Sequence, residues 1–435
     1  MSSFYTKSKG FAMKTRLLAS VTVACILFGT ATSHAVTVEA ESGSREDIQA
    51  AINEAPENAT VVIPEGEFNW RGPRINIDKD ITISGSGDKG TVLNKTSALD
   101  WFFNVVSEGF FRLTNIVLDG NRRGGGVQMR TDNLDFRIDN STFRNFGTRA
   151  VQTYGGAKGL IDNNEFLENR PTDIVVYGDN DKSWNEPLQL GTDDAVYVED
   201  NVFTHKTVSN SHSIASNRGS KYVFRYNTIN DGDQNTNPID AHGNYYHGRG
   251  SRSYEIYGNE VNSGHSYMGM YIRGGTGVIF DNEMNGSFTH PLILENYRSF
   301  RQSNVRYPAP DQIHDLHIWD NQKNGEEVTP FMRDRGKVRE HIKENRDYFL
   351  NPKADYTPYT YPHPMRGEKA DETTAVVPTE AAPAAPAPSI QKSPAGVNAG
   401  SSILNPMKEE EEEKTGLEKV KTPWDKFIRT FSILG

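Results

Sequence analysis

The strongest constraint on the fold is a short pattern that recurs along the middle of the chain. Each copy has alternating apolar residues, then a small polar residue, one further residue and another apolar residue, as in GLIDNNEF at 159–166. Intervals between successive polar positions run from 23 to 39 residues, which predicts a parallel β-solenoid with insertions of varying length. These positions are Asn115, Ser141, Asn164, Asn201, Asn227, Asn259, Asn282 and Asn321.

The stacking of coils explains why the same residue types return. Strands of successive coils lie about 4.8 Å apart, so equivalent side chains form ladders. Inward positions favour Val, Ile, Leu and Phe, whereas a tight corner favours Asn, which tolerates left-handed dihedrals and can hydrogen-bond along a ladder. A solenoid needs only narrow inner ladders, which fits an apolar share of 35%. A β-sandwich with regular turns is the alternative, but eight copies of one motif argue against it.

Together with its two ends, the repeat region resembles right-handed parallel β-helix proteins of the pectate-lyase-like superfamily. The segment 45–68 looks like the opening of such domains, with an amphipathic helix that would cover the open end of the core and present Ile48, Ala51 and Ile52 to it. The segment 356–365, YTPYTYPHPM, resembles their C-terminal closing segment. The resemblance implies an all-β, single right-handed solenoid. It leaves the activity open, because the superfamily holds lyases, hydrolases, epimerases, esterases and phage tailspikes.

Composition excludes several classes of function. The chain has 47 basic and 57 acidic residues and a formal net charge of −10, so a dedicated nucleic-acid binder is not expected. Its single Cys allows no internal disulfide and no Cys-rich zinc site. We expect a monomer.

The N-terminus has the pattern of an export signal. Lys14 and Arg16 precede an apolar run over 17–28, and small residues lead to Ala35, which predicts a signal peptide at 1–35. The protein is therefore expected to be secreted or exported to a periplasm, and association with the cell surface is a further alternative. A lipoprotein anchored near Cys25 is an alternative. Met13 is a second candidate for the start.

Four regions follow from these patterns. They are the signal peptide at 1–35, a β-helix domain at 36–366, a Pro/Ala- and Glu-rich linker at 367–414, and a short amphipathic segment at 415–435. The last segment has apolar residues at helical spacing over 424–434, where it could dock to an envelope or a protein. The alternative is a disordered tail.

Aligning the coils predicts one polar outer face. In the β-helix geometry, the strand before each Asn corner belongs to the second sheet, and the chain reaches the first sheet after the third. First-sheet strands alternate inward and outward residues, so two outward ladders can be read from the sequence. One runs through Gln128, Gln152, Val175, Ala215, Asp240, Tyr271 and Ile293; the other runs through Arg130, Tyr154, Tyr177, Asn217, His242, Arg273 and Glu295.

The ionisable part of this face suits proton abstraction from C5 of a uronic acid. Such a reaction needs a base and a group that neutralises the sugar carboxylate. His242 is the candidate base, Arg273 the carboxylate clamp, Tyr271 or Tyr245 the opposing acid, and Asp240 a further catalytic residue. Asp240-Ala-His-Gly resembles the Asp-Pro-His-Asp motif of alginate C5 epimerases and departs from it at two of four positions.

The remaining candidates would contact substrate or a metal. The expected substrate contacts are Asn217, Tyr245, Arg249, Arg252, Glu295, Tyr177 and Trp184. Arg249 and Arg252 have a second interpretation as loop anchors. Asp193 and Asp194 lie in an insertion at 178–195 and could hold Ca²⁺, whereas the sequence indicates no other cofactor. A hydrolase using these paired carboxylates is a lesser alternative.

These observations favour an exported β-helix enzyme acting on an acidic polysaccharide, either a lyase or a C5 epimerase. The competing interpretation is a β-helix that binds glycans or serves as an adhesion module without catalysis.

Overall fold

The computed structural model describes most of the predicted β-helix domain. The predicted signal peptide, nearly all of the linker and the C-terminal amphipathic segment lie outside the described residues. Within these residues, no helix combines the length and apolar character needed to cross a membrane. The described ranges are 36–87, 90–96, 100–209, 211–233, 237–244, 248–296, 306–333 and 338–367.

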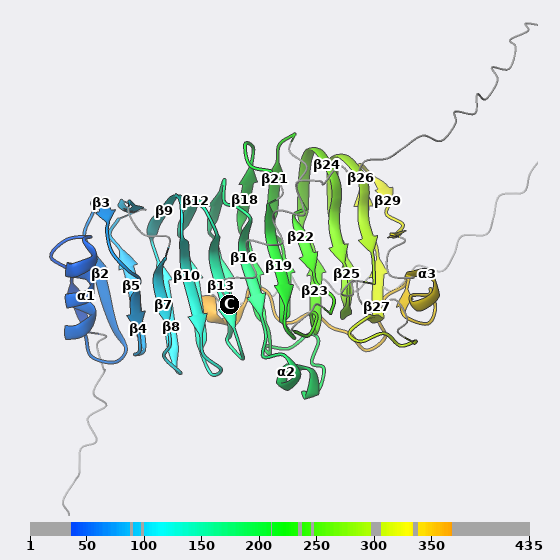
Figure 1. Cartoon of the computed structure of the whole chain (residues 1–435), viewed down its shortest axis with the longest axis horizontal. Coiled ribbons are helices and arrows are strands. Elements are labelled where there is room, and N and C mark those ends of the chain that lie inside the picture. Colours follow the sequence, from blue (N-terminus) through cyan, green and yellow to red (C-terminus); the bar gives the residue numbers. More distant parts are fainter. Residues whose placement is uncertain are drawn as a thin grey trace, which may run out of the picture. The chain divides into compact units, whose positions relative to one another are not determined.

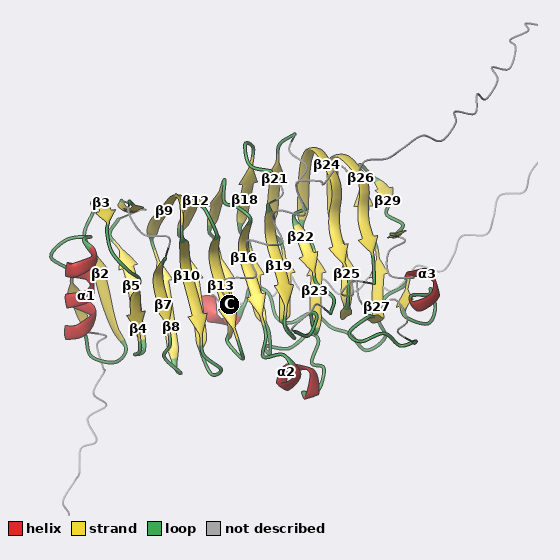
Figure 2. Ribbon diagram, viewed as in Figure 1, coloured by secondary structure: helices red, strands yellow, loops and turns green. Residues whose placement is uncertain are grey.

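The domain is a parallel β-helix, as predicted, in which strands stack coil upon coil along one axis (Figures 1 and 2). The strands that precede the Asn corners form the second sheet, and every pairing in it is parallel. Its strands are β1 (Thr37–Glu39), β2 (Ala59–Ile63), β5 (Ile81–Gly85), β8 (Phe110–Thr114), β11 (Asp135–Asp139), β14 (Lys158–Asp162), β17 (Val196–Glu199), β20 (Lys221–Arg225), β23 (Ser253–Tyr257), β25 (Gly275–Phe280), β27 (Ile313–Trp319) and β31 (Tyr348–Phe349).

The first and third sheets share one hydrogen-bonded network, because β24 (Glu260–Ile272) and β26 (Glu283–Leu294) run through both. The third sheet also contains β3 (Gly66–Trp70), β6 (Thr91–Lys95), β9 (Ile116–Arg123), β12 (Thr142–Phe146), β15 (Glu165–Leu167), β18 (Val202–His205), β21 (Thr228–Asp231), β28 (Gln322–Lys323) and the antiparallel β29 (Glu326–Glu327). The first sheet also contains β4 (Ile75–Ile77), β7 (Trp101–Val105), β10 (Gly125–Arg130), β13 (Arg149–Tyr154), β16 (Thr172–Tyr177), β19 (His212–Asn217), β22 (Ile239–Ala241) and β30 (Phe331–Met332).

The register of the first sheet matches the alignment made from the sequence. The inner residues pair from coil to coil without a slip and are fully buried. A shift by one residue would turn every inner side chain outward, so burial of this ladder fixes which residues point away from the core. The inner ladder is Val127, Val151, Ile174, Ile214, Ile239, Met270 and Leu292.

The Asn ladder forms, but the left-handed residue is its neighbour. From Asn164 onward each ladder amide donates to the Oδ1 of the next, at 2.8 to 3.1 Å. The positive φ falls one residue earlier, as at Asn163 and Asp200. Asn115 is therefore misplaced in the predicted ladder, because its φ is 57° and the strand register aligns it with Asn140 rather than with Ser141. The ladder position needs a buried amide, and the corner needs the left-handed backbone.

The helices of the described residues are short and lie outside the coils. The predicted N-terminal helix is α1 (Arg45–Glu54), which covers the N-terminal end of the core (Figure 1). Ser44 caps it by accepting a hydrogen bond from the backbone N–H of Asp47, and Ile48 and Ile52 are buried. The other helices are α2 (Asp181–Asn185), α3 (Val338–His341) and the 3₁₀ turn η1 (Pro364–Arg366).

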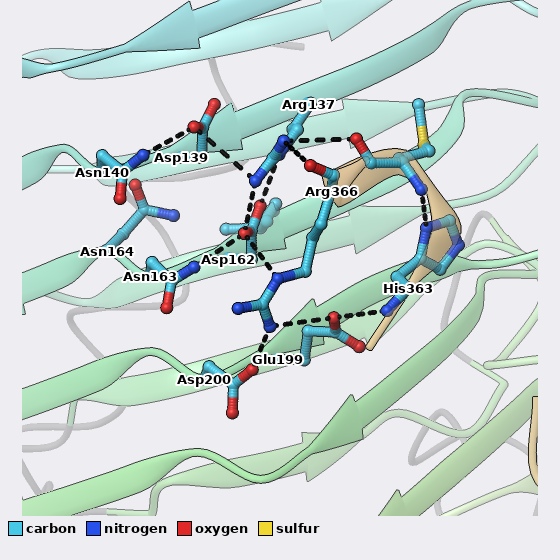
Figure 3. A network of polar contacts seen from close by, with 12 residues as sticks. Arg137, Asp139, Asn140, Asp162, Asn163, Asn164, Glu199, Asp200, His363 and Arg366 are labelled. Carbon is cyan, nitrogen blue, oxygen red and sulfur yellow. Dashed lines mark hydrogen bonds and ion pairs between the residues drawn. The ribbon is translucent and has the colours of Figure 1, made fainter. Parts of the chain in front are cut away.

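Residues 352–367, which we call the strap, return along the outer face of the second sheet. Figure 3 shows Arg366 and His363 of the strap beside the carboxylates of that sheet. Arg366 pairs with Asp200 at 2.5 Å, and the backbone N–H of His363 donates to Glu199 at 2.9 Å. Arg225 donates to the carbonyl of Thr360 at 2.9 Å. The predicted closing segment therefore covers a face of the solenoid.

Candidate functional site

The central feature of the open face is an ion pair that holds a histidine. Asp240 lies in β22, and Arg273 and His242 follow the strands of two neighbouring coils. Arg273 donates from Nη2 to both carboxylate oxygens of Asp240, at 2.7 and 2.6 Å, and from Nε at 3.1 Å. Nε2 of His242 lies 3.1 Å from Oδ2 of the same carboxylate. The Asp240 side chain is 3% exposed, whereas that of His242 is 29% exposed. The imidazole is thus fixed from below and accessible from outside.

A second group extends this site toward the C-terminal coils. The Tyr271 hydroxyl donates to the carboxylate of Glu295, and Nη1 of Arg333 donates to the same hydroxyl at 3.2 Å. The Arg333 guanidinium also lies 3.6 Å from Glu295. The guanidinium of Arg273 stacks over the Tyr271 ring at 4.5 Å and joins the two groups. We call the six residues His242, Asp240, Arg273, Tyr271, Glu295 and Arg333 the polar cluster.

The electrostatics of the cluster favour a neutral imidazole beside an ionised carboxylate. Burial and the positive charge of Arg273 lower the pKa of His242 below its usual 6.5, although Asp240 opposes this shift. Burial alone would raise the pKa of Asp240, but the charges of Arg273 and His242 lower it well below its usual range. Burial raises the pKa of the Tyr271 phenol. At neutral pH His242 is therefore able to accept a proton.

Arg273 has a different neighbourhood from the one expected of a substrate clamp. Its guanidinium is buried and makes a bidentate pair with Asp240. A guanidinium that neutralises a buried carboxylate has little capacity left for a second one. Arg333, at the edge of the cluster, is the more exposed cation, with 21% of its side chain accessible.

A row of Arg and Tyr side chains continues the open face toward the N-terminal coils. The rings of Tyr154 and Tyr177 lie 5.2 Å apart. Arg130 stacks over Tyr154 at 5.1 Å, and Arg218 stacks over Tyr177 at 4.8 Å. Both arginines are exposed, and neither has a carboxylate partner among the described residues. Asn217, beside them, accepts a hydrogen bond from the backbone N–H of Arg218. We call this set the basic row.

Trp184, Arg249 and Arg252 gather in a separate place. Both guanidinium groups stack on the Trp184 ring, at 4.4 and 5.2 Å. Arg249 also pairs with Asp311 at 2.7 Å, and the Trp184 indole donates to the carbonyl of Gly250 at 3.2 Å. These contacts fasten the 178–195 insertion to the turn after β22, as the anchor interpretation expects. Tyr245 lies outside the described residues.

One of the paired aspartates of the insertion, Asp194, lines a pocket. Asp194 pairs with Lys221 at 2.6 Å and is one of the lining residues, together with Tyr177, of a cavity of about 380 Å³. Within the described ranges, no group of three or more His, Cys, Asp or Glu side chains is arranged to hold a metal. Among the described residues, no third His, Cys, Asp or Glu side chain is therefore placed to complete a Ca²⁺ site with Asp193 and Asp194.

Sequence reasoning missed Arg333 and Asp311. Arg333 follows β30, whose Phe331 pairs with Ile293, so extending the first-sheet alignment by one coil would have found it. Asp311 accepts from Arg249 and from the backbone N–H of Gly250, at 3.1 and 2.9 Å. It lies in a connection without repeat pattern, so no sequence signal pointed to it.

Comparison with known proteins gives matches to solved structures only. No protein-family model and no curated protein sequence matches the chain. An alginate lyase from Paenibacillus sp. str. FPU-7 matches with a TM-score of 0.41 and 11% identity, over 68% of this chain and 97% of that one. A pectin methylesterase matches with a TM-score of 0.37 and 11% identity, over 72% and 96%. The A-module of an Azotobacter vinelandii mannuronan C-5 epimerase matches with a TM-score of 0.27 and 12% identity, over 71% and 96%. Values this low transfer no activity, so the parallel strand pairing itself carries the assignment of this chain as a parallel β-helix.

Proposed function

We propose that the protein acts on a uronate-containing polysaccharide by removing the proton at C5, as a lyase or a C5 epimerase. The observation that carries this proposal is His242, partly exposed on the open face and held by the buried Asp240–Arg273 pair. A base that is oriented by a carboxylate and neutral near pH 7 is what general base catalysis requires.

In this proposal, five of the six residues of the polar cluster have separate tasks. The Asp240 carboxylate, 3.1 Å from Nε2, orients the imidazole of His242, and this imidazole takes the C5 proton. Arg273 keeps Asp240 ionised and thereby holds the imidazole in place. Arg333 is the cation that meets the substrate carboxylate and stabilises the charge that develops as the proton leaves. Tyr271 supports the guanidinium of Arg333 through its hydroxyl.

The basic row supports an anionic, extended substrate. Arg130 and Arg218 present positive charge on the same face as His242, three coils apart. Exposed cations that have no carboxylate partner among the described residues attract a polyanion and lower the cost of bringing its carboxylates to the surface. The overall charge of −10 does not oppose this, because attraction at a groove depends on local charge. Secretion, which would give access to such a substrate, stays a prediction from the residues before 36.

The decisive experiment measures exchange of the C5 hydrogen. The full chain is incubated in deuterated water with polymannuronate, polyguluronate or polygalacturonate, and NMR detects deuterium at C5 or in new sugar epimers. Ultraviolet absorbance reports the unsaturated product of a lyase. Native chain should produce one of these signals, and His242→Gln should lose it while its melting temperature stays unchanged. If native chain binds a uronan but leaves every one chemically intact, the glycan-binding interpretation replaces the enzyme.

A further inference from the structure

Three aromatic side chains form a continuous row beside the polar cluster. Tyr267 of β24 meets His290 of β26 edge to face, with ring centroids 5.3 Å apart. His290 stacks flat on Phe331 of β30, at 3.7 Å and an interplanar angle of 10°. The rings come from three consecutive strands of the first sheet, so the row follows the solenoid axis. We call these three residues the aromatic row.

The aromatic row is accessible to solvent. Phe331 is 38% exposed, although one face of its ring is covered by His290. Its accessible area therefore belongs to the other face and the ring edge. Burial and the nearby charge of Arg333 lower the pKa of His290, which keeps this imidazole neutral and suited to a flat stack at neutral pH. Exposed aromatic area at this position contributes little to the core.

Arg333 joins the aromatic row to the polar cluster. Its guanidinium lies 5.6 Å from the centre of the Tyr267 ring and 5.5 Å from that of Tyr271. A single cation therefore lies between an accessible aromatic surface and the residues assigned to catalysis. A pyranose ring has an apolar C–H face that covers aromatic surface, and a uronate adds a carboxylate that pairs with a guanidinium.

We propose that the aromatic row forms a subsite for the sugar unit of the substrate that lies next to the unit reacting at His242, with Arg333 between the two units. This inference rests on the proposed function and specifies it. The C–H face of this neighbouring sugar stacks on Phe331, and Arg333 meets the carboxylate of the reacting unit. The bound chain then continues past His242 to the basic row, so the substrate lies along the axis of the solenoid.

The test measures the affinity of the full chain for hexasaccharides of mannuronate, guluronate and galacturonate by calorimetry, in the His242→Gln background so that no turnover occurs. Phe331→Ala should weaken binding about tenfold through loss of the stacking surface, whereas Phe331→Tyr should retain it. Phe110→Ala is the matched control, because Phe110 is 37% exposed and belongs to β8 of the second sheet. It should leave the affinity unchanged.

The role of Arg333 is separated by the charge of the ligand. Arg333→Gln should weaken binding of the acidic hexasaccharides and leave unchanged the affinity for a neutral glucan hexasaccharide. Equal affinity of Phe331→Ala and its parent, with an unchanged melting temperature, would overturn the subsite, as would absence of binding to all three acidic ligands. If binding depends on Phe331 while native chain changes no uronan, the subsite stands and the proposed reaction fails.

Discussion

The first and second sheets both carry arginine–carboxylate pairs on their outer faces, yet only one face is open. On the second sheet, Arg225 pairs with Glu199 at 2.6 Å, and both side chains are 0% exposed. On the first sheet, Arg273 pairs with Asp240 at the same distance, with side chains that are 8% and 3% exposed. Judged by the pairs alone, the two faces are alike.

The difference lies in what completes each pair. Arg225 also donates to the strap carbonyls of Tyr359 and Thr360, at 2.7 and 2.9 Å, so the protein itself covers the guanidinium. Asp240 has a partly exposed histidine as its further partner. A buried ion pair is therefore weak evidence of function, because the same pair serves to dock a segment of chain. Function becomes arguable where the network ends in a group that a substrate can reach.

The largest difference between the open first-sheet face and the covered second-sheet face is expected in the effect of histidine substitutions on kcat. His242→Gln should reduce kcat about 10²- to 10⁴-fold, the usual contribution of a general base, without lowering the melting temperature. His363→Gln, on the strap, should leave kcat unchanged, because His363 packs against Tyr197 and faces no open surface. Kinetics on a responsive uronan and thermal melts measure both. Full activity in His242→Gln would remove the distinction between the faces.

On the covered face we expect a loss of stability. Arg225→Met leaves Glu199 buried without its main partner and should cost about 3–5 kcal/mol of unfolding free energy, measured by urea denaturation. The folded fraction should keep normal kcat, since the change is confined to the second sheet. A Met variant as stable as the native chain would show that the strap alone compensates for the lost charge.

Substitutions of Arg273 and Asp240 should shift the pH dependence of activity in opposite directions, because their charges act oppositely on the pKa of His242. His242 acts as a base when neutral, so activity rises with pH through its pKa, with a midpoint below 6.5 in the native chain. Arg273→Gln removes a positive charge that lowers this pKa, so the midpoint should rise. Asp240→Asn removes a negative charge that raises it, so the midpoint should fall. Nearby His212 also lowers the pKa of His242, and this contribution is present in the native chain and in both variants. Profiles of kcat/KM against pH that shift in the same direction would contradict the arrangement.

The smallest effect concerns the basic row. Arg218→Gln should weaken uronan binding about two- to fivefold and reduce its salt dependence, as expected for one exposed charge. Arg123→Gln removes another exposed arginine, from β9 of the third sheet, and should have no effect. Titrations at two ionic strengths distinguish them. Equal losses in both variants would mean that the chain attracts polyanions without a preferred face.

The fold was predictable because its repeat is local. Each coil can be recognised in the sequence by its alternating apolar residues and its corner residue. The register of Asp240 with Tyr271 followed from counting along the strands. The placement of the left-handed residue was not predictable from composition, since Asn occupies both the corner and the ladder at 163 and 164. The motif pattern cannot say which of two adjacent Asn residues is buried.

The sequence predicted the face on which the candidate site lies, but not the side-chain contacts within the site. Alignment brought Asp240, His242, Tyr271, Arg273 and Glu295 to one face, where the structure has them. It could not show that Arg273 forms an ion pair with Asp240, because side-chain pairing depends on rotamers and on which other charged groups lie within reach. It also left Arg333 out, because the first-sheet alignment stopped one coil earlier, at Glu295, although the motif with Asn321 precedes Arg333 in its own coil.

The sequence by itself determined the parallel β-helix, the coil register and the face on which ionisable residues gather, because these follow from a periodic pattern of burial. Only the tertiary structure decided which face is covered. Arg225 and Thr360 are 135 residues apart, and no local preference links them. Their contact forms because the strap carbonyls satisfy a buried guanidinium, an energetic gain that exists only once the coils have stacked.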